Sequence, residues 1–129
     1  MEKTGSDGGY MGEFEIQKLK TGFRFLLRAA NGQCIATSET YASETACRGG
    51  MESVCLNAQA PVEDLTTGEK AVPNPKFQLY LDKRGLYRFR LKARNGRIIA
   101  ASQAYRSKAA CLEGIESIRN NVCSPEENP

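Results

Sequence analysis

The sequence repeats itself at an offset of 64 residues. Residues 24–57 read RFLLRAANGQCIATSETYASETACRGGMESVCLN, residues 88–121 read RFRLKARNGRIIAASQAYRSKAACLEGIESIRNN, and half of the aligned positions are identical. Such internal similarity indicates one supersecondary unit present twice. One copy with its first strand would have on the order of 45 residues, too few to bury much of a core alone. We therefore expect the two copies to share one core.

The composition divides the 129 residues into segments. Residues 1–12 are rich in glycine and polar residues and are predicted to form a flexible N-terminal tail. A single domain follows at 13–122, made of repeat one (13–58), a proline-containing linker or short strand (59–75) and repeat two (76–122). Residues 123–129 are predicted to form a C-terminal tail.

Each repeat has the pattern of three strands followed by a helix. Asn31-Gly32 and Asn95-Gly96 lie between alternating runs and predict two-residue type I′ hairpin turns. The resulting register places Arg94 opposite Arg97. It also assigns one face of each hairpin to the core. These predicted core positions are Phe25, Leu27, Ala29, Cys34 and Ala36 in repeat one, and Phe89, Leu91, Ala93, Ile98 and Ala100 in repeat two.

The helix of each repeat is predicted to begin after a serine N-cap, at Ser43 and Ser107. Gly50 and Gly114 fall in mid-helix, where glycine costs about 1 kcal/mol relative to alanine. We interpret this repeated cost as a close approach of helix and sheet; a functional cleft is the alternative interpretation. Together these elements predict an α+β two-layer fold. Its tandem β3-α(-β) repeats, related by pseudo-twofold symmetry, form one mainly antiparallel sheet with both helices on one face.

The repeated motif resembles the YegP-like family of uncharacterised bacterial proteins. It runs from Asn-Gly through S-x-x-Y and a serine-capped helix to G-[IM]-E-S-[VI], over residues 31–54 and 95–118. Members of this family carry one copy or two. The resemblance implies that the last strand of each unit is exchanged into the other half. The short, proline-containing residues 122–129 depart from the family pattern at that strand. The family has no established activity, so no catalytic residue is transferred.

Composition excludes several kinds of chemistry. The chain has no histidine, which excludes Ser-His-Asp and Cys-His catalysis and histidine-bearing zinc sites. Its five cysteines contain no C-x-x-C pair, and no metal or other cofactor is indicated. No apolar run is long enough to span a membrane, and the first residues do not resemble a secretory signal. We therefore expect a cytoplasmic protein with reduced thiols.

The net charge of +3 is unevenly distributed. Repeat one has five basic and five acidic residues, whereas repeat two has eleven basic and three acidic residues and a charge of +8. On the strands of repeat two the expected register gathers a basic face of Arg88, Arg90, Lys92, Arg94 and Arg97, with Tyr80 beside it. This face is either the solvated side of a sheet or a contact surface for an acidic protein or a nucleic acid. Nucleic acid has weak support, since Tyr80 is the one aromatic residue placed to stack.

The leading hypothesis is thus a small non-enzymatic binding module. The alternative is an enzyme or small-ligand binder at the junction of the repeats, using Tyr41, Tyr105, Glu52 and Glu116. A third hypothesis is self-association through the sheet, with either a monomer or a homodimer as the resting state.

Overall fold

The computed structural model describes residues 13–121. Within that range, seven strands and two helices follow in the order β1 (Glu13–Leu19), β2 (Gly22–Arg28), β3 (Cys34–Thr37), α1 (Glu44–Asn57), β4 (Val62–Asp64), β5 (Lys76–Leu81), β6 (Tyr87–Lys92), β7 (Ile98–Ser102) and α2 (Lys108–Asn121). This is the strand, strand, strand, helix order expected of each repeat. The proposed tails at 1–12 and 123–129 lie outside the described residues.

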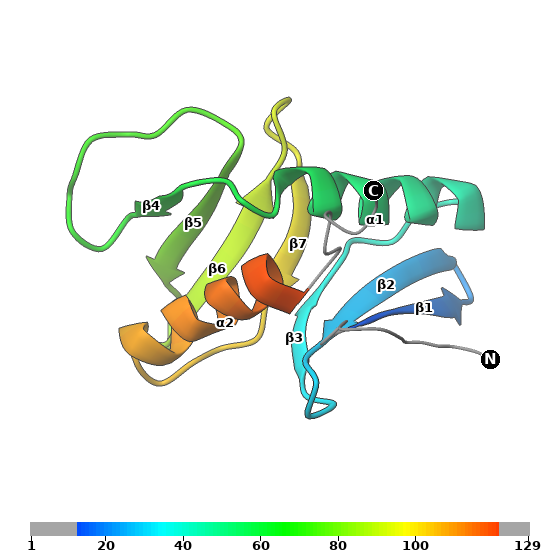
Figure 1. Cartoon of the computed structure of the whole chain (residues 1–129), viewed down its shortest axis with the longest axis horizontal. Helices are drawn as coiled ribbons and strands as arrows, with labels where there is room; N and C mark the ends of the chain where they lie inside the picture. Colours follow the sequence, from blue (N-terminus) through cyan, green and yellow to red (C-terminus); the bar gives the residue numbers. More distant parts are fainter. Residues whose placement is uncertain (1–12, 122–129) are drawn as a thin grey trace.

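One sheet holds all the described strands in the order β1-β2-β3-β7-β6-β5-β4 (Figure 1). The third strands of the two repeats pair at its centre, Ala36 with Ser102 and Thr37 with Ala101. β4 follows α1 in the chain but pairs with β5, in parallel, at the far edge of repeat two. The sheet is therefore mainly antiparallel, and the segment that follows repeat one contributes a strand to the half formed by repeat two.

Both helices lie against one face of the sheet and help to build a single core. α1 contacts β2 and β7, whereas α2 contacts β6 and β3, so each helix bridges the two repeats. The Ser43 and Ser107 hydroxyls accept from Ala46 N and Ala110 N, which confirms both N-caps. The fully buried large side chains come from both repeats and are Phe25, Leu27, Cys47, Val54, Phe77, Leu79, Phe89, Leu91, Cys111, Ile115 and Ile118. The expected shared core is confirmed.

The predicted hairpin turns are wrong by one residue. Ala93 N donates to Arg97 O at 2.9 Å, and Gly96 N donates to Ala93 O at 2.8 Å, so the loop has three residues. Gly96 has a φ of +87°, as in a three-residue loop that ends on a left-handed residue. Arg94 and Arg97 are therefore not cross-strand partners, and the expected repulsion between them does not arise.

Beside each turn the strand pairing shifts by one residue, so the residue after the predicted core position is the one that is buried. In repeat two, Leu91 pairs with Ala100 but Lys92 pairs with Ile98, so Ile99 is the extra residue of a bulge. Ile99 is 6% exposed and Ile98 is 42% exposed, the reverse of the prediction. Repeat one has the same shift, which buries Ile35 and leaves Cys34 half-buried.

Each mid-helix glycine faces a tyrosine of its own repeat. A Cβ on Gly50 would overlap the Tyr41 hydroxyl and lie 3.1 Å from Phe25, and a Cβ on Gly114 would overlap the Tyr105 hydroxyl. Tyr41 is stacked on Phe25 with ring centroids 6.3 Å apart, and Tyr105 is stacked on Phe89 at 6.4 Å. The expected close approach is confirmed, and the tyrosine ring is what fills the space.

Candidate functional site

The outer face of repeat two, which points away from the helices, gathers polar side chains from β5 and β6. Cross-strand pairing sets Lys76 beside Lys92, Gln78 beside Arg90, and Tyr80 beside Arg88. The intervening residues of both strands point to the core, because successive side chains alternate between faces. Three of the predicted basic residues and Tyr80 are thus brought onto one face.

A buried ion pair lies under this face at the β4–β5 edge. Glu63 is 5% exposed and lies 2.9 Å from the Lys76 ammonium. Its carboxylate also accepts from the Gln78 amide at 2.7 Å and from Val72 N at 2.8 Å. The hydrogen bond from Gln78, with those from Val72 and Lys76, lowers the pKa of Glu63 to about 2. Glu63 is therefore ionised at neutral pH, with its oxygens fully engaged.

This network fixes the orientation of Arg90. Gln78 donates to Glu63 and, through its carbonyl oxygen, accepts from Arg90 Nε at 2.8 Å. The Arg90 guanidinium also lies over the Tyr80 ring, 4.6 Å from its centroid. Among the described residues, the terminal amino groups of Arg90 have no hydrogen-bond partner. A guanidinium that is fixed through its Nε and through one face of its plane can use its terminal N–H groups to bind a carboxylate or a phosphate.

The other predicted basic residues differ in how they are compensated. Arg88 pairs with Asp82 and Arg97 pairs with Glu39, each at 2.9 Å. Within residues 13–121 the side chains of Lys92 and Arg94 have no ion pair or hydrogen bond. Arg94 lines a groove beside α1 with Leu56 and Asn57. The strongest candidate for anion binding on the outer face is therefore Arg90 with Lys92.

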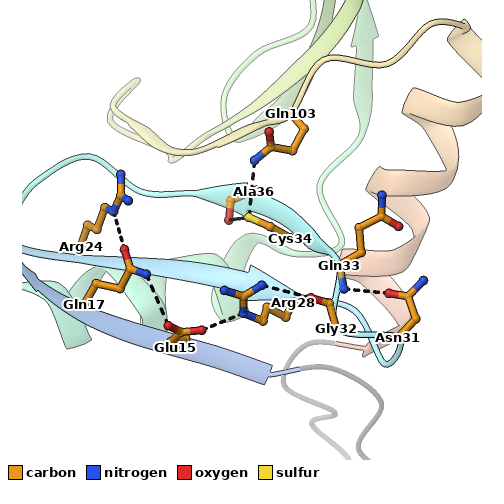
Figure 2. Close-up of polar contacts among 10 residues, drawn as sticks. All are labelled: Glu15, Gln17, Arg24, Arg28, Asn31, Gly32, Gln33, Cys34, Ala36 and Gln103. Carbon is orange, nitrogen blue, oxygen red and sulfur yellow. Dashed lines mark hydrogen bonds and ion pairs between the residues drawn. The ribbon is translucent and has the colours of Figure 1, made fainter.

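Repeat one carries a less basic version of the same face (Figure 2). Arg24 Nε donates to Gln17 at 2.9 Å, and Arg28 Nε donates to Glu15 at 2.7 Å. The hydrogen bond from Arg28 holds the pKa of Glu15 below its usual value. Leu26 occupies the position equivalent to Arg90. Among the described residues Arg24 is bonded through Nε alone, as Arg90 is, but Arg28, the equivalent of Lys92, is paired with Glu15. The combination of two uncompensated neighbouring cations, Arg90 and Lys92, is thus found in repeat two.

The alternative set consists of two tyrosines that precede the helices and two glutamates on the helices. The Tyr41 and Tyr105 rings lie against Gly50 and Gly114, and burial raises the pKa of both hydroxyls. Glu52 and Glu116 are exposed, and Glu116 pairs with Arg119 at 2.7 Å. Tyr105 lines a cavity of about 370 Å³ whose carboxylate is Glu113. Within the part of the chain that the structure describes, no hydrogen bond, ion pair or ring contact joins any two of the four residues.

The four described cysteines have three different environments. Cys47 and Cys111 are buried, and burial raises the pKa of both thiols, that of Cys111 to about 11. Cys34 is a half-buried free thiol that accepts from the Gln103 amide at 3.5 Å (Figure 2). Cys55 is disulfide-bonded, so the expectation of reduced thiols is wrong at this position. In the described part of the chain, no three potential ligands converge as a metal site.

Sequence reasoning missed Glu63 and Gln78, which organise the site. Gln78 had a visible signal, since it alternates with Phe77 and Leu79 and so falls on the outer face. Glu63 lies in a segment read as a linker or short strand, and its burial follows from the pairing of β4 with β5.

No helix in the described range is long and apolar enough to cross a membrane.

The fold and the repeated Tyr–Gly packing define a class of α+β proteins built from two tandem units. Known proteins place the chain more closely: the family model described as "Domain of unknown function (DUF1508)" matches twice, at residues 20–64 and 82–126. The chain belongs to this family.

Relatives and solved structures agree with this assignment. The chain is 40% identical to a UPF0339 protein of Stutzerimonas stutzeri over 112 residues, 86% of the chain and 89% of the relative. The solution structure of YegP from Escherichia coli has a TM-score of 0.73 and 33% identity and covers 92% of this chain and 91% of its own. A UPF0339 protein of Methanosarcina acetivorans is 59% identical over 47 residues, 36% of this chain but 81% of the relative. A relative therefore exists at about the length of one repeat, and the family includes the YegP-like proteins that the motif resembled.

Proposed function

We propose that the chain is a non-enzymatic binding module whose outer face in repeat two contacts an acidic partner. The observation that carries the proposal is the geometry of Arg90, held by Gln78 at 2.8 Å and by the Tyr80 ring at 4.6 Å. Its terminal donors have no partner among residues 13–121. Arg90 is half-buried, so part of its hydration is already removed before a ligand arrives. Because the Arg90 side chain is already oriented, binding a carboxylate or phosphate costs less side-chain conformational entropy.

An acidic protein fits this face better than a single-stranded nucleic acid. Nucleic-acid binders of that kind present open aromatic rings on which bases stack. Here the aromatic ring that the described residues place on the outer face of repeat two, Tyr80, already has the Arg90 guanidinium over one of its faces. A partner with carboxylates needs only the arginine and lysine donors. The cytoplasmic location expected from the sequence belongs to the same proposal and would be tested by cell fractionation.

The direct test compares two arginines in matched settings. Fluorescence anisotropy would follow the binding of labelled hexaglutamate and labelled oligothymidylate to the wild-type chain, Arg90→Gln and Arg24→Gln. Arg24 is the control because it too donates through Nε to a glutamine, but its neighbouring cation Arg28 is paired with Glu15 and Glu15 lies against the same glutamine. Loss of a charge-assisted hydrogen bond predicts about tenfold weaker hexaglutamate binding for Arg90→Gln, and little change for Arg24→Gln.

Added salt provides a second readout. Ion pairs at an exposed face weaken as the Debye length falls from about 30 Å at 0.01 M to about 10 Å at 0.1 M salt. Binding that is insensitive to salt, or equal loss in the two variants, would refute a role for this face. Tighter binding of oligothymidylate than of hexaglutamate would instead identify nucleic acid as the partner.

A further inference from the structure

A groove of about 560 Å³ lies between the last turn of α1 and the turn that joins β6 to β7. Figure 1 shows that turn beside the C-terminal end of α1. The groove is distinct from the outer face that carries Arg90, because it opens on the helical side of the sheet. Its main lining residues are Leu56, Asn57, Pro75, Ala93, Arg94 and Asn95.

The walls of this groove, called the α1 groove below, are mostly apolar in surface. Leu56 is 84% exposed, which is unusual for a leucine on a helix whose other face is packed. Pro75 and Ala93 continue the apolar surface. The amide of Asn57 donates to Ser53 O at 2.8 Å, and the carbonyl oxygen of Asn95 accepts from Arg97 N at 2.9 Å. These internal bonds leave Arg94 as the charged group available to a ligand.

Arg94 is exposed and, within residues 13–121, has no ion pair or hydrogen bond from its side chain. A free guanidinium at the rim of an apolar groove is complementary to a molecule with an apolar body and one carboxylate. We propose that the α1 groove binds amphipathic carboxylates, with the apolar group against Leu56 and Pro75 and the carboxylate on Arg94.

The pseudosymmetric groove of the other repeat provides an internal comparison. It has about 370 Å³ and includes Ala29, Asn31 and Ser117, the equivalents of Ala93, Asn95 and Ser53 at the 64-residue offset. Ala30 stands at the position equivalent to Arg94, and Asn120 at the position equivalent to Leu56. The charged residue of that groove is Glu113. The fold therefore requires neither the arginine nor the exposed leucine, and the α1 groove has both.

The experiment is a two-dimensional NMR titration of the ¹⁵N-labelled full chain with phenylacetate. Phenylacetamide, which lacks the charge, and phenethylamine, which reverses it, are the matched probes. We expect phenylacetate to shift the amides of Leu56, Ala93 and Arg94 with a dissociation constant on the order of 1 mM. Arg94→Gln should weaken binding about fivefold or more, whereas Glu113→Gln and Arg90→Gln should leave it unchanged.

A second pair of probes distinguishes a free acid from a peptide. The peptide acetyl-Gly-Gly-Leu with a free C-terminal carboxylate is compared with its C-terminal amide. Tighter binding of the free peptide than of phenylacetate identifies a protein C-terminus as the source, and the reverse order identifies a small acid. The proposal is overturned if phenylacetamide shifts the same amides equally, if the shifts map elsewhere, or if Arg94→Gln binds as wild type. Because Arg90→Gln tests the outer face separately, failure of either site can be recognised independently.

Discussion

Gly50 and Gly114 stand where each helix comes closest to a tyrosine ring of its own repeat. A Cβ at Gly50 would lie 2.7 Å from Tyr41 Cζ and 3.1 Å from Phe25, and the ring cannot retreat because it is stacked on that phenylalanine. Glycine costs about 1 kcal/mol in helix propensity at each position, but a larger residue would overlap the tyrosine ring. The repeated glycine could be interpreted from the sequence, but the tyrosine that requires it could not.

Gly50→Ala should destabilise the fold although alanine favours helices. Overpacking of a filled site typically costs about 1–3 kcal/mol, more than the gain of about 1 kcal/mol in propensity. Gly49→Ala is the matched control, since its Cβ would meet nothing within 4 Å in the same helix. Denaturant unfolding should show opposite signs for the two variants. Equal stabilisation by both would mean that the tyrosine does not restrict Gly50.

Glu63 illustrates a residue whose role depends on a neighbour distant in sequence. Its partners are Lys76 and Gln78, on a strand that follows a long loop. Composition predicts an exposed acidic residue in that segment, whereas the β4–β5 pairing buries it. Such burial depends on strand pairing, which a single sequence specifies weakly.

Glu63→Gln should lower the free energy of unfolding by about 3 kcal/mol at pH 7, because Lys76 is left buried without its counter-ion. The pKa of Glu63 is lowered from 4.5 in the unfolded chain to about 2. Its stabilisation is therefore fully present above about pH 4.5 and is lost as the pH falls towards 2.

Equilibrium unfolding between pH 5 and pH 2 measures this contribution. Glu15, Asp64 and Asp82 also have lowered pKa values and lose stabilisation in the same direction, so the difference between variants is the informative quantity. The wild type should lose more stability than Glu63→Gln over this range. Glu69→Gln, at an exposed position, is the control and should follow the wild type. Parallel curves for wild type and Glu63→Gln would contradict the assignment.

At the scale of elements, the hairpin turns determine which residues of β3 and β7 face the core. The Asn-Gly signal correctly located both hairpins but not the length of their loops. The additional loop residue and the adjacent bulge place Ile99 and Ala100 together on the inner face. Two neighbouring isoleucines fit either register, so hydrophobic alternation could not choose between Ile98 and Ile99.

Gly32 allows the turn to be tested without a steric complication, since it has a φ of +85° and a Cβ there would meet nothing within 4 Å. Gly32→Ala should cost about 1 kcal/mol through left-handed backbone strain. Gly32→Asn should cost less, because asparagine tolerates this region better. Thermal or denaturant unfolding checks the order wild type, asparagine, alanine. An alanine variant as stable as wild type would contradict the conformation assigned to this turn.

At the scale of the whole molecule, the two repeats agree in their interior and differ in their surfaces. The caps, the glycine–tyrosine packing and the bulges recur in both halves. Repeat one pairs Arg28 with Glu15 and has Leu26 at the position of Arg90, whereas within residues 13–121 repeat two leaves Lys92 and the terminal donors of Arg90 without a partner. The charge asymmetry was visible in the sequence. Which cations are compensated was not, because Glu39 and Asp82 reach their arginines through tertiary geometry.

The central claim is that function lies where the repeats differ, on the outer face of β5 and β6. An NMR map of the amide shifts caused by hexaglutamate at low salt tests it most directly. We predict that the shifts concentrate on Gln78, Tyr80, Arg90 and Lys92, and that they disappear in Arg90→Gln. Shifts spread equally over both repeats, or confined to β1 and β2, would contradict the account.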